Sequence, residues 1–333
     1  MGYKIAVVGA TGLVGQTIIK VIEELNLPVS DLIPVASARS QGKTVRFRGK
    51  TIKVVDANTA ISKEPKVAIF SAGASVSRKL APQFADAGII VIDNSSAWRM
   101  DENVPLVVPE VNASQILKKH KIIANPNCST IQMVVALHPL HKAYNLKRVI
   151  VSTYQSVTGS GIKGAQQLDD ERAGRVANGP YPYQIDLNVI PQGGSFEQNG
   201  YSQEELKLVY ESRKILGIKD LSVTPTVVRV PVKGGHSESV TAEFAKDFEI
   251  TNVRDIFSMH DGIRLMDDPF KEVYPMPLYS EGRDEVFIGR LRKDLFQKNT
   301  LNMWVVSDNL RKGAATNAVQ IAQYIISQKH LAS

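Results

Sequence analysis

The chain has 333 residues, of which 43% are hydrophobic and 22% charged, and a formal net charge of +7, which is typical of a globular protein large enough for two domains. A single cysteine excludes an intramolecular disulfide and a cysteine-rich metal site and fits a reducing compartment, so we expect a cytoplasmic protein without a metal. No apolar run approaches 18 residues and no signal peptide is evident, so we expect no membrane partner. No zinc finger, aromatic RNA-binding motif or basic helix is evident, so we expect no nucleic-acid partner. The excess positive charge belongs either to a solvated surface or to a site for anionic ligands.

Short apolar strands and amphipathic helices alternate over the first 125 residues. We expect strands at residues 4–8, 32–36, 67–70, 89–92 and 122–124, with helices at 12–25 and 76–87. Two short runs, 44–47 and 51–55, predict an inserted hairpin. Because strands that alternate with helices form parallel sheets, this half predicts a Rossmann-type, doubly wound α/β domain.

The pattern changes after a helix that begins near Cys128, which Pro139 is expected to kink or end. An α+β domain with a mixed, largely antiparallel sheet is predicted there, from strands at 149–154, 222–230, 239–244, 286–291 and 301–306, helices at 163–176, 203–216 and 253–260, and a long loop at 178–200. A last helix, 312–328, is expected to return to the first domain. The expected domains are therefore 1–127 plus 312–333, and 128–311.

Three glycines, Gly9, Gly12 and Gly15, follow the first strand and open the first helix. Glycines in this context let the backbone approach a pyrophosphate at the positive end of a helix, which predicts a dinucleotide site. The alternative is a purely structural turn between strand and helix.

The segment after the second strand separates the two nicotinamide cofactors. An NAD site usually carries an acidic residue there, whereas this chain has Arg39, Ser40 and Lys43 and no acid. These side chains suit a 2′-phosphate, so the sequence favours NADP(H). The alternative is that Arg39 is an exposed loop charge.

The lone thiol, Cys128, lies at an expected helix start directly after Asn125-Pro126-Asn127. A helix N-terminus stabilises a thiolate, and a thiol beside a nicotinamide site predicts aldehyde chemistry through a thioester. The alternative is an inert packing residue. A histidine is the expected proton carrier; His236, after two glycines, is one candidate that spacing alone does not select, whereas His138 and His141 are expected to have packing or surface roles.

An ordered set of motifs runs across nearly the whole chain and comprises residues 9–15, 94–99, 125–130, 154–159, 211–214 and 229–231 through 235–237. Together these motifs resemble those of aspartate-β-semialdehyde dehydrogenase. Two departures are mild: Thr158 stands where serine is usual, and Trp98 where the family often has Phe.

This resemblance implies an enzyme that makes aspartate semialdehyde from aspartyl phosphate with NADPH, in the biosynthesis of lysine, threonine, methionine and isoleucine. It implies that Cys128 is the nucleophile, that His236 takes and returns the thiol proton, and that Gln155 orients the substrate. It also implies a homodimer built through the sheet of the second domain.

The substrate carries a carboxylate, an amine and a phosphate, and the resemblance supplies a residue for each. Arg229 would hold the α-carboxylate, Glu211 the α-amine, and Lys214 and Arg99 the phosphate. The alternatives are an ordinary surface ion pair for Glu211 and Lys214, three apart on one helix, and a surface arginine for Arg99.

For the cofactor, the resemblance implies contacts from both halves of the sequence. The matching residues are Gly9, Thr11, Gly12, Leu13, Val14, Gly15, Arg39, Ser40, Thr158, Gly159 and Asn317. The last of these lies on the terminal helix, in agreement with its expected return to the first domain.

Three other functions compete with this one. N-acetyl-glutamyl-phosphate reductase shares the general plan of this enzyme. Asn127, the Gln155 motif and the presence of both Glu211 and Arg229 disfavour it. A free α-amine needs an acidic partner such as Glu211, whereas an acetylated amine does not. A nucleotide-binding regulatory or scaffold protein without catalytic activity is disfavoured, because the reactive residues are all present, namely Cys128, Gln155, Arg229 and His236. An NAD-dependent, glyceraldehyde-phosphate-dehydrogenase-like oxidation is disfavoured by the missing acid after the second strand.

Overall fold

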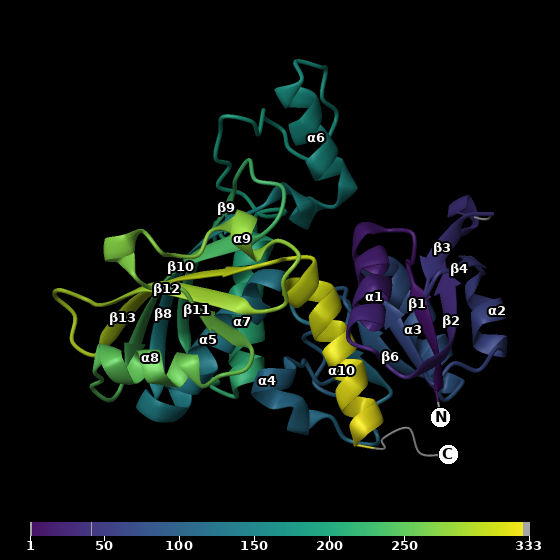
Figure 1. Ribbon diagram of the computed structural model, residues 1–333, viewed down its shortest axis with the longest axis horizontal. Coiled ribbons are helices and arrows are strands. Elements are labelled where there is room, and N and C mark those ends of the chain that lie inside the picture. Colours follow the sequence, from purple (N-terminus) through teal and green to yellow (C-terminus); the bar gives the residue numbers. More distant parts are fainter. Residues whose placement is uncertain (1, 41, 329–333) are drawn as a thin grey trace. The chain divides into compact units, whose positions relative to one another are not determined.

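The computed structural model describes residues 2–40 and 42–328, which form two compact units, each with its own sheet (Figure 1). The first unit contains the residues up to Asn127 and those from Ala314 onward; the second is Cys128–Gly313. The chain thus returns to the first unit two residues after position 312, where the sequence places the boundary. No helix within the described ranges has the length and apolarity needed to cross a bilayer.

The sheet of the first unit is entirely parallel. Its strands run in the order β2-β1-β5-β6-β7 and comprise β1 (Tyr3–Val8), β2 (Val29–Val35), β5 (Val67–Phe70), β6 (Ile90–Asp93) and β7 (Ile122–Ala124). Since β2 and β5 flank β1 on opposite sides, the strand order reverses there, which is where ligands bind in such sheets. The predicted Rossmann-type sheet is confirmed.

Helices cover both faces of this sheet because both of its faces are apolar. Ile5 and Val7 point into a core shared with α1 (Leu13–Glu24) and α10 (Thr316–Ser327), while Ala6 and Val8 point into the core beneath α3 (Ala74–Asp86). The smaller elements are α2 (Ala57–Ser62), α4 (Pro109–Asn112), the 3₁₀ turns Ala38–Ser40 and Ala113–Gln115, and the expected hairpin of β3 (Thr44–Phe47) and β4 (Lys50–Lys53). The terminal helix therefore does return to this unit.

The second unit is built on a six-stranded sheet in the order β11-β12-β13-β10-β8-β9. Its strands are β8 (Leu146–Gln155), β9 (Ser222–Arg229), β10 (His236–Phe244), β11 (Ile263–Leu265), β12 (Val286–Lys293) and β13 (Thr300–Ser307). The β8–β9 and β11–β12 pairs are parallel and the others antiparallel, so the sheet is mixed, as predicted. The sequence analysis missed β11, whose three residues are too few to show alternation.

One face of this sheet is covered by α5 (Cys128–Tyr144), α7 (Gln203–Leu216) and α8 (Ile250–Ser258). Of the two effects expected of Pro139, a kink or an end, the end does not occur, because α5 continues for five residues beyond it. Most residues between Ser129 and Leu137 are buried, so packing on nearly every side offsets the hydrogen bond that proline removes. The remaining elements are α6 (Ile162–Arg172), α9 (Pro277–Ser280), the 3₁₀ turns Val157–Ser160 and Pro269–Lys271, and one π-helical turn, Arg311–Ala315, part of which belongs to the first unit.

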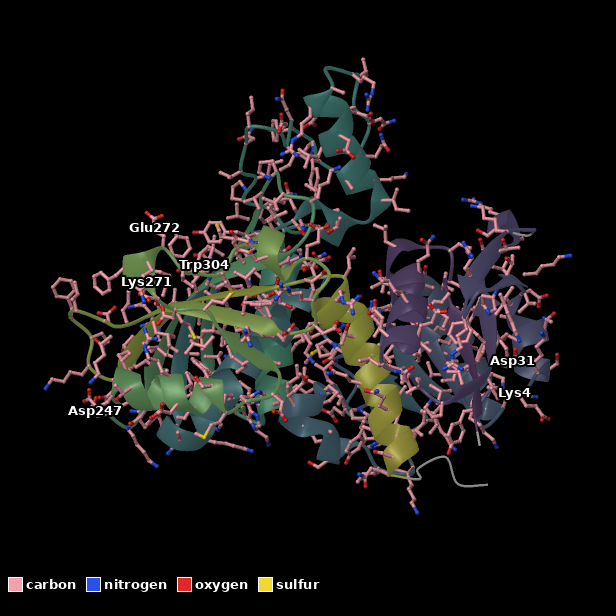
Figure 2. All side chains as sticks on the ribbon, in the orientation of Figure 1. Lys4, Asp31, Asp247, Lys271, Glu272 and Trp304 are labelled. Atoms are coloured by element: carbon pink, nitrogen blue, oxygen red, sulfur yellow. The ribbon has the colours of Figure 1, made fainter. Side chains whose placement is uncertain are left out.

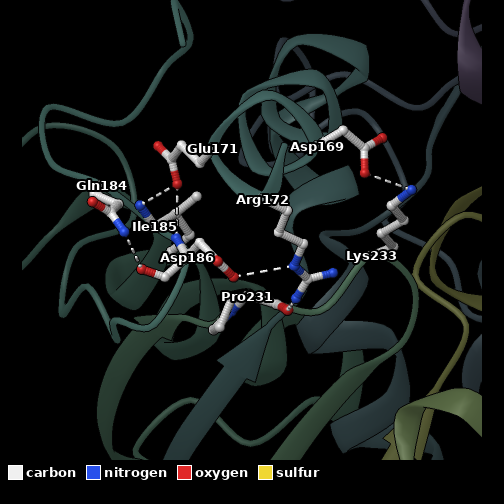
Figure 3. Close-up of polar contacts among 8 residues, drawn as sticks. All are labelled: Asp169, Glu171, Arg172, Gln184, Ile185, Asp186, Pro231 and Lys233. Carbon is white, nitrogen blue, oxygen red and sulfur yellow. Dashed lines mark hydrogen bonds and ion pairs between the residues drawn. The ribbon is translucent and has the colours of Figure 1, made fainter. Parts of the chain in front are cut away.

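Polar contacts fasten α6 to the long loop and to the segment before His236 (Figure 3). The Glu171 carboxylate accepts from the backbone N–H groups of Ile185 and Asp186, at 2.9 and 2.8 Å. Arg172 pairs with Asp186 at 3.1 Å and donates to the carbonyl oxygen of Pro231 at 2.7 Å. These bonds give a region without regular strands a defined position over the end of the sheet.

A fully buried carboxyl group, that of Glu238, lies on the helix-covered face of β10. Neither of its oxygens has a hydrogen-bond partner of normal geometry among the described residues, although the Gln132 amide lies beside it. Burial raises the pKa of Glu238 well above its usual value, and the Gln132 amide opposes this shift. Burial thus favours the neutral, protonated form of Glu238.

We predict that Glu238→Gln makes the folded protein less sensitive to alkaline pH. The folded pKa of Glu238 lies above the unfolded one, so its stabilising contribution is complete below the unfolded pKa and is lost as pH rises, by about 1.4 kcal/mol per pH unit until the folded pKa is reached. Thermal unfolding from pH 5 to 8 should show the variant gaining on the parent chain as pH rises. Glu243→Gln, half-buried on the other face of β10, is the control; parallel curves for all three proteins would contradict the prediction.

Candidate functional site

The glycine loop at the start of α1 fits a dinucleotide cradle. Gly9 has φ of +84°, and a Cβ there would lie 2.9 Å from the Ser71 hydroxyl oxygen. A Cβ on Gly15 would lie 2.2 Å from the carbonyl oxygen of Gly9. Gly12 is the N-cap of α1, which therefore has no capping side chain over its first turn. The loop therefore leaves backbone N–H groups at the N-terminus of α1 without side chains over them, which is the arrangement that binds a pyrophosphate.

Basic side chains border a pocket beside this loop. The pocket, of about 430 Å³, is lined by Thr11, Gln16, Ile19, Lys43, Thr44, Val45 and Arg46. The Thr11 and Ser40 hydroxyl oxygens are 3.3 Å apart, and Arg39 is exposed on the adjacent 3₁₀ turn. The lining residues carry two cations and no carboxylate, which suits an anionic ligand group. Sequence reasoning missed Arg46, whose place in a hairpin gives no signal of proximity to the loop.

Arg99 is held inside the first unit and is not a surface arginine. It is 7% exposed, and its Nε and Nη2 donate to the carbonyl oxygens of Asn125 and Asn94, at 3.0 and 2.9 Å. The Asn317 amide nitrogen donates to the Asn125 side-chain oxygen at 2.7 Å and to the Val107 carbonyl at 2.9 Å. Asn317 thus ties α10 to the chain just before the cysteine motif, a structural role that sequence reasoning did not identify.

Three ends of strands meet at one edge of the sheet in the second unit. Gln155 ends β8 and pairs in register with Arg229, which ends the parallel strand β9. The antiparallel strand β10 begins at this edge with His236, because Ser237 pairs with Tyr154. Register therefore places an amide, a guanidinium and an imidazole side by side, all of them at most 6% exposed.

Cys128 is the first residue of α5 and is half-buried. A Cβ on Gly313 would lie 2.9 Å from the Cβ of Cys128, so only glycine fits there. The next residue, Ser129, accepts a hydrogen bond from the Gln155 amide at 2.8 Å, which connects the start of α5 to the sheet edge. The helix N-terminus favours a thiolate at this position.

The ring of His236 is fully buried and held from one side. Its Nδ1 accepts from the backbone N–H of Ser156 at 3.0 Å and lies 3.1 Å from the Ser156 hydroxyl oxygen. Its Nε2 has no hydrogen-bond partner among the described residues. Burial, together with the positive charge of Arg229, lowers the pKa of His236 to about 3, so the imidazole is neutral at pH 7.

Gly159 lies against both the histidine and the arginine. A Cβ there would be 2.6 Å from Nη1 of Arg229 and 3.2 Å from Nε2 of His236. The Thr158 hydroxyl donates to the carbonyl oxygen of Lys233 at 2.7 Å. These two residues, which the sequence predicts to contact the cofactor, therefore also make contacts within the second unit.

Glu211 and Lys214 lie on α7, which packs against α5 and β9. Glu211 is 2% exposed, so the alternative of an ordinary surface ion pair is wrong. Arg229 donates to the Ser156 carbonyl oxygen at 2.8 Å and borders a cavity of about 330 Å³, which the long loop lines with Tyr181, Ile190 and Gln192 among others. This cavity can take a small anionic ligand beside a fixed guanidinium.

Two buried residues at this edge were not found from the sequence, Ser156 and Asn309. Ser156 lies inside the motif 154–159, but only the fold reveals that its N–H faces an imidazole. The Asn309 side-chain oxygen accepts from the N–H of Gly235 and the hydroxyl of Ser156. Of the other histidines, His141 in the last turn of α5 accepts the backbone N–H of Leu146 through Nδ1, at 3.1 Å.

Comparisons with known proteins cover nearly the whole chain. The family models "Semialdehyde dehydrogenase, NAD binding domain" and "Semialdehyde dehydrogenase, dimerisation domain" match residues 4–119 and 137–312. The aspartate-semialdehyde dehydrogenase of Aquifex aeolicus is 48% identical over 98% of this chain and 99% of its own length, and that of Bacillus subtilis is 46% identical over 97% of each.

Solved structures agree with these sequence relatives. Aspartate semialdehyde dehydrogenase II from Vibrio cholerae, crystallised in complex with ASA, superposes with a TM-score of 0.94 and 44% identity over 98% of this chain and 99% of that one. The Candida albicans enzyme with NADP gives a TM-score of 0.77 and 25% identity, over 99% and 100%. With full-length identity of this order and both domain models matched in sequence order, the chain belongs to the aspartate-semialdehyde dehydrogenase family.

Proposed function

We propose that this protein catalyses the reversible, NADPH-dependent reductive dephosphorylation of L-4-aspartyl phosphate to L-aspartate 4-semialdehyde. The observation that carries this proposal is the edge of the second sheet, where Gln155, Arg229 and His236 lie in register and a hydrogen bond joins Gln155 to the residue after Cys128. Family membership supplies the reaction class. The product would feed the biosynthesis of lysine, with diaminopimelate as a precursor, and of threonine, methionine and isoleucine.

Cys128 is the proposed nucleophile. Its thiolate, favoured at the N-terminus of α5, attacks the acyl carbon, and phosphate leaves with the electron pair of the carbon–oxygen bond, which gives a thioester. The bound nicotinamide would supply the hydride that reduces this carbonyl. The carbon–sulfur bond then breaks with its electron pair on sulfur, and the aldehyde leaves. Gln155 orients the substrate, and His236 takes and returns the thiol proton through Nε2, the ring atom that has no hydrogen-bond partner among the described residues.

Each charged group of the substrate has a proposed partner. Arg229 takes the α-carboxylate as a two-pronged donor, and the buried Glu211 takes the α-amine. Lys214 and Arg99 bind the phosphate. A buried acid for the amine is the feature that favours a substrate with a free amine over an acetylated one.

The residues present fit a dinucleotide, as the glycine cradle shows. We propose that Gly9, Gly12 and Gly15 admit the pyrophosphate, with Thr11, Leu13 and Val14 lining the turn into α1. Arg39 and Ser40, with Lys43 and Arg46 at the neighbouring pocket, would hold a 2′-phosphate, which favours NADP(H). Thr158, Gly159 and Asn317 are proposed as further contacts of this cofactor.

We further propose a cytoplasmic homodimer that uses the face of the second sheet opposite α5, α7 and α8. This face carries Ile150, which is 41% exposed, and the ring pair of Tyr154 and Trp304, whose centroids are 5.3 Å apart. Trp304 is labelled in Figure 2. A pocket of about 290 Å³ on the same face is lined by Trp304 and Met276 among others. The dimerisation domain model that matches residues 137–312 supports a dimer formed through this unit. The reducing compartment follows from the need for a reduced thiol.

The first test is a phosphate-dependent oxidation assay. We expect aspartate semialdehyde, phosphate and NADP to give reduced cofactor, measured by absorbance, with little signal when phosphate is omitted. NAD and N-acetyl-glutamate semialdehyde are assayed in parallel. A signal confined to the acetylated aldehyde would refute the proposed substrate and reopen the roles of Glu211 and Arg229.

We predict that Cys128→Ser lowers turnover by roughly 10³-fold or more, because a serine hydroxyl lacks a thiolate's nucleophilicity at neutral pH. Binding of NADPH, measured by fluorescence titration, should remain within about twofold of the parent value, since the cradle lies in the other unit. Turnover that survives the substitution would rule out the covalent mechanism.

We predict that Arg39→Ala raises the KM for NADPH roughly tenfold and leaves the KM for NADH nearly unchanged, since a charge-assisted bond of about 1.4 kcal/mol exists only with the 2′-phosphate. Steady-state kinetics with both cofactors provide the measurement. Lys119→Ala, which removes an exposed cation of the same unit outside the pocket, is the control. An equal loss with both cofactors would place Arg39 elsewhere than at the 2′-phosphate.

We predict that Ile150→Glu converts the dimer to a monomer, because burying a carboxylate in an apolar interface without a partner is costly. Light scattering after size-exclusion chromatography measures the mass. Val76→Glu is a matched control, since Val76 is 42% exposed but lies on α3 of the first unit. If Ile150→Glu keeps the parent mass, this face is not the interface.

A further inference from the structure

Hydrogen bonds tie the first two turns of α5 to the sheet edge at two points. Ser129 accepts from the Gln155 amide of β8 at 2.8 Å. Three residues later, the Gln132 amide donates to the backbone carbonyl oxygen of His236, the first residue of β10, at 3.3 Å. Residues three apart lie on one side of a helix, so α5 makes both bonds from the same side. Because Gln132 is 1% exposed and His236 is fully buried, water does not compete for the second bond.

Gln132 lies one helical turn after the reactive thiol. Cys128 and Gln132 are four residues apart, a spacing that places both side chains on one face of α5. The same helix face thus carries the thiol and, one turn later, an amide that holds the backbone of His236. The imidazole of His236 is the group proposed to take and return the thiol proton. One hydrogen bond therefore connects the element that carries the nucleophile with the element that carries its base.

The Gln132 amide also lies beside the buried carboxyl of Glu238, which follows His236 by two residues on the same face of β10. The strands that flank β10 give this carboxyl no partner. Val305 on β13 is apolar, and the hydroxyl of Thr153 on β8 has no hydrogen-bond partner among the described residues. An amide nitrogen carries two hydrogens, so that of Gln132 can serve both the His236 carbonyl and the Glu238 carboxyl.

A carboxyl group at position 238 costs folding free energy. It is fully buried and lacks a hydrogen bond of normal geometry among the described residues, so an apolar side chain would suit the position better. Departures of this kind are expected mainly where function requires them. What the carboxyl supplies is a second acceptor for Gln132, which keeps the nitrogen of the amide, and not its oxygen, directed toward β10.

Apolar packing alone does not fix the placement that proton transfer needs. Around these ties α5 is buried through apolar side chains such as Ile131, Met133 and Val134. Burial of apolar surface is non-directional, so it tolerates small rotations and shifts of a helix. A hydrogen bond weakens steeply with distance and angle, and a general base must lie within hydrogen-bond reach of the proton it takes. The polar tie is therefore the contact that can set the distance between thiol and imidazole.

On the basis of the proposed function, we propose that Gln132 is a positioning residue, kept in orientation by Glu238, which ties α5 to the start of β10 and so holds the Cys128 thiol within reach of the His236 imidazole. Gln132 and Glu238 act only through these two residues and do not touch the substrate. Both lie just outside the motifs 125–130 and 235–237 that carry the family resemblance.

Alkylation of the thiol tests this proposal without any turnover. Cys128 is the only cysteine in the sequence, so modification by iodoacetamide reports it alone. Gln132→Met keeps the length of the side chain but removes the donor. We expect it to slow alkylation at pH 7 roughly fivefold or more, because the imidazole is no longer placed to take the thiol proton. At about pH 9.5, where a thiol ionises unaided, the rates should agree, which would show that access to the thiol is unchanged.

Ile131→Val is the matched control for alkylation, since it removes one buried methylene from the same turn of α5 and leaves the tie intact. It should match the parent protein at both pH values. Equal rates for Gln132→Met and the parent protein at pH 7 would overturn the proposal.

Steady-state kinetics separate positioning from a merely structural role. We expect Gln132→Met to lower kcat roughly tenfold and to change the KM for aspartate semialdehyde and for NADP by less than about twofold, since the binding groups stay in place. Ile131→Val should keep the parent kcat. A raised KM with an unchanged kcat would make Gln132 part of the binding site and would refute the positioning role.

Two substitutions of Glu238 test its part, and they serve equally if Gln132→Met does not fold. Glu238→Gln retains an acceptor for the Gln132 amide, so we expect at least about half of the parent kcat. Glu238→Leu removes the acceptor and should lower kcat roughly fivefold, with little further loss when it is combined with Gln132→Met, because both act through one tie. Equal kcat values for the two Glu238 variants would refute the role of the carboxyl as an acceptor.

The outcomes distinguish this inference from the proposed function. If the oxidation assay fails with aspartate semialdehyde while Gln132→Met still slows alkylation, the substrate is refuted and the tie between α5 and β10 stands. If the assay succeeds and alkylation of Gln132→Met matches that of the parent protein, the tie is refuted and the proposed function stands.

Discussion

The geometry of the candidate site in the second unit depends on the register of three strands. Because β8 and β9 are parallel and β10 is antiparallel to β8, the carboxyl ends of two strands and the start of the third lie at one edge. A one-residue slip would turn Gln155 to the opposite face. Apolar residues on the helix-covered face, such as Val149, Val151 and Val240, prevent that slip. Packing beneath α5 therefore fixes the positions of the polar groups.

Much of the fold followed from periodicity, and the reasons for the failures are physical. The strands of the parallel sheet are apolar runs bounded by polar turns, which sequence displays directly. The helix α5 continues past Pro139, although proline has a low helix propensity, because most of α5 is buried. Helix propensity is a local property and contains no information about burial in the folded protein. The strand β11 and the helix α9 are too short to carry a period, and α2, though capped by Asp56, has only six residues.

Some residues of the candidate site could be predicted from the sequence, and others could not. Cys128 and the glycine loop carry local signals, a helix start and a spacing, and sequence alone indicates them. His236 could not be chosen among six histidines until the family motifs were considered, because what distinguishes it is contact with Ser156 across the sheet. Asn309 gives no local signal at all: its partners lie 74 and 153 residues away. Site residues that act through long-range hydrogen bonds become visible only in the folded chain.

The return of α10 to the first unit has a consequence for synthesis on the ribosome. Val319, Ile321, Ala322 and Ile325 complete the core that Ile5 and Val7 begin, some 310 residues earlier in the chain. The cofactor cradle forms first in sequence but cannot close its core until the C-terminal helix has emerged, whereas residues 128–313 are already contiguous. The unit that is translated first is thus the last to complete its core. Until α10 is synthesised, the apolar face that α10 will cover stays exposed and is prone to aggregation.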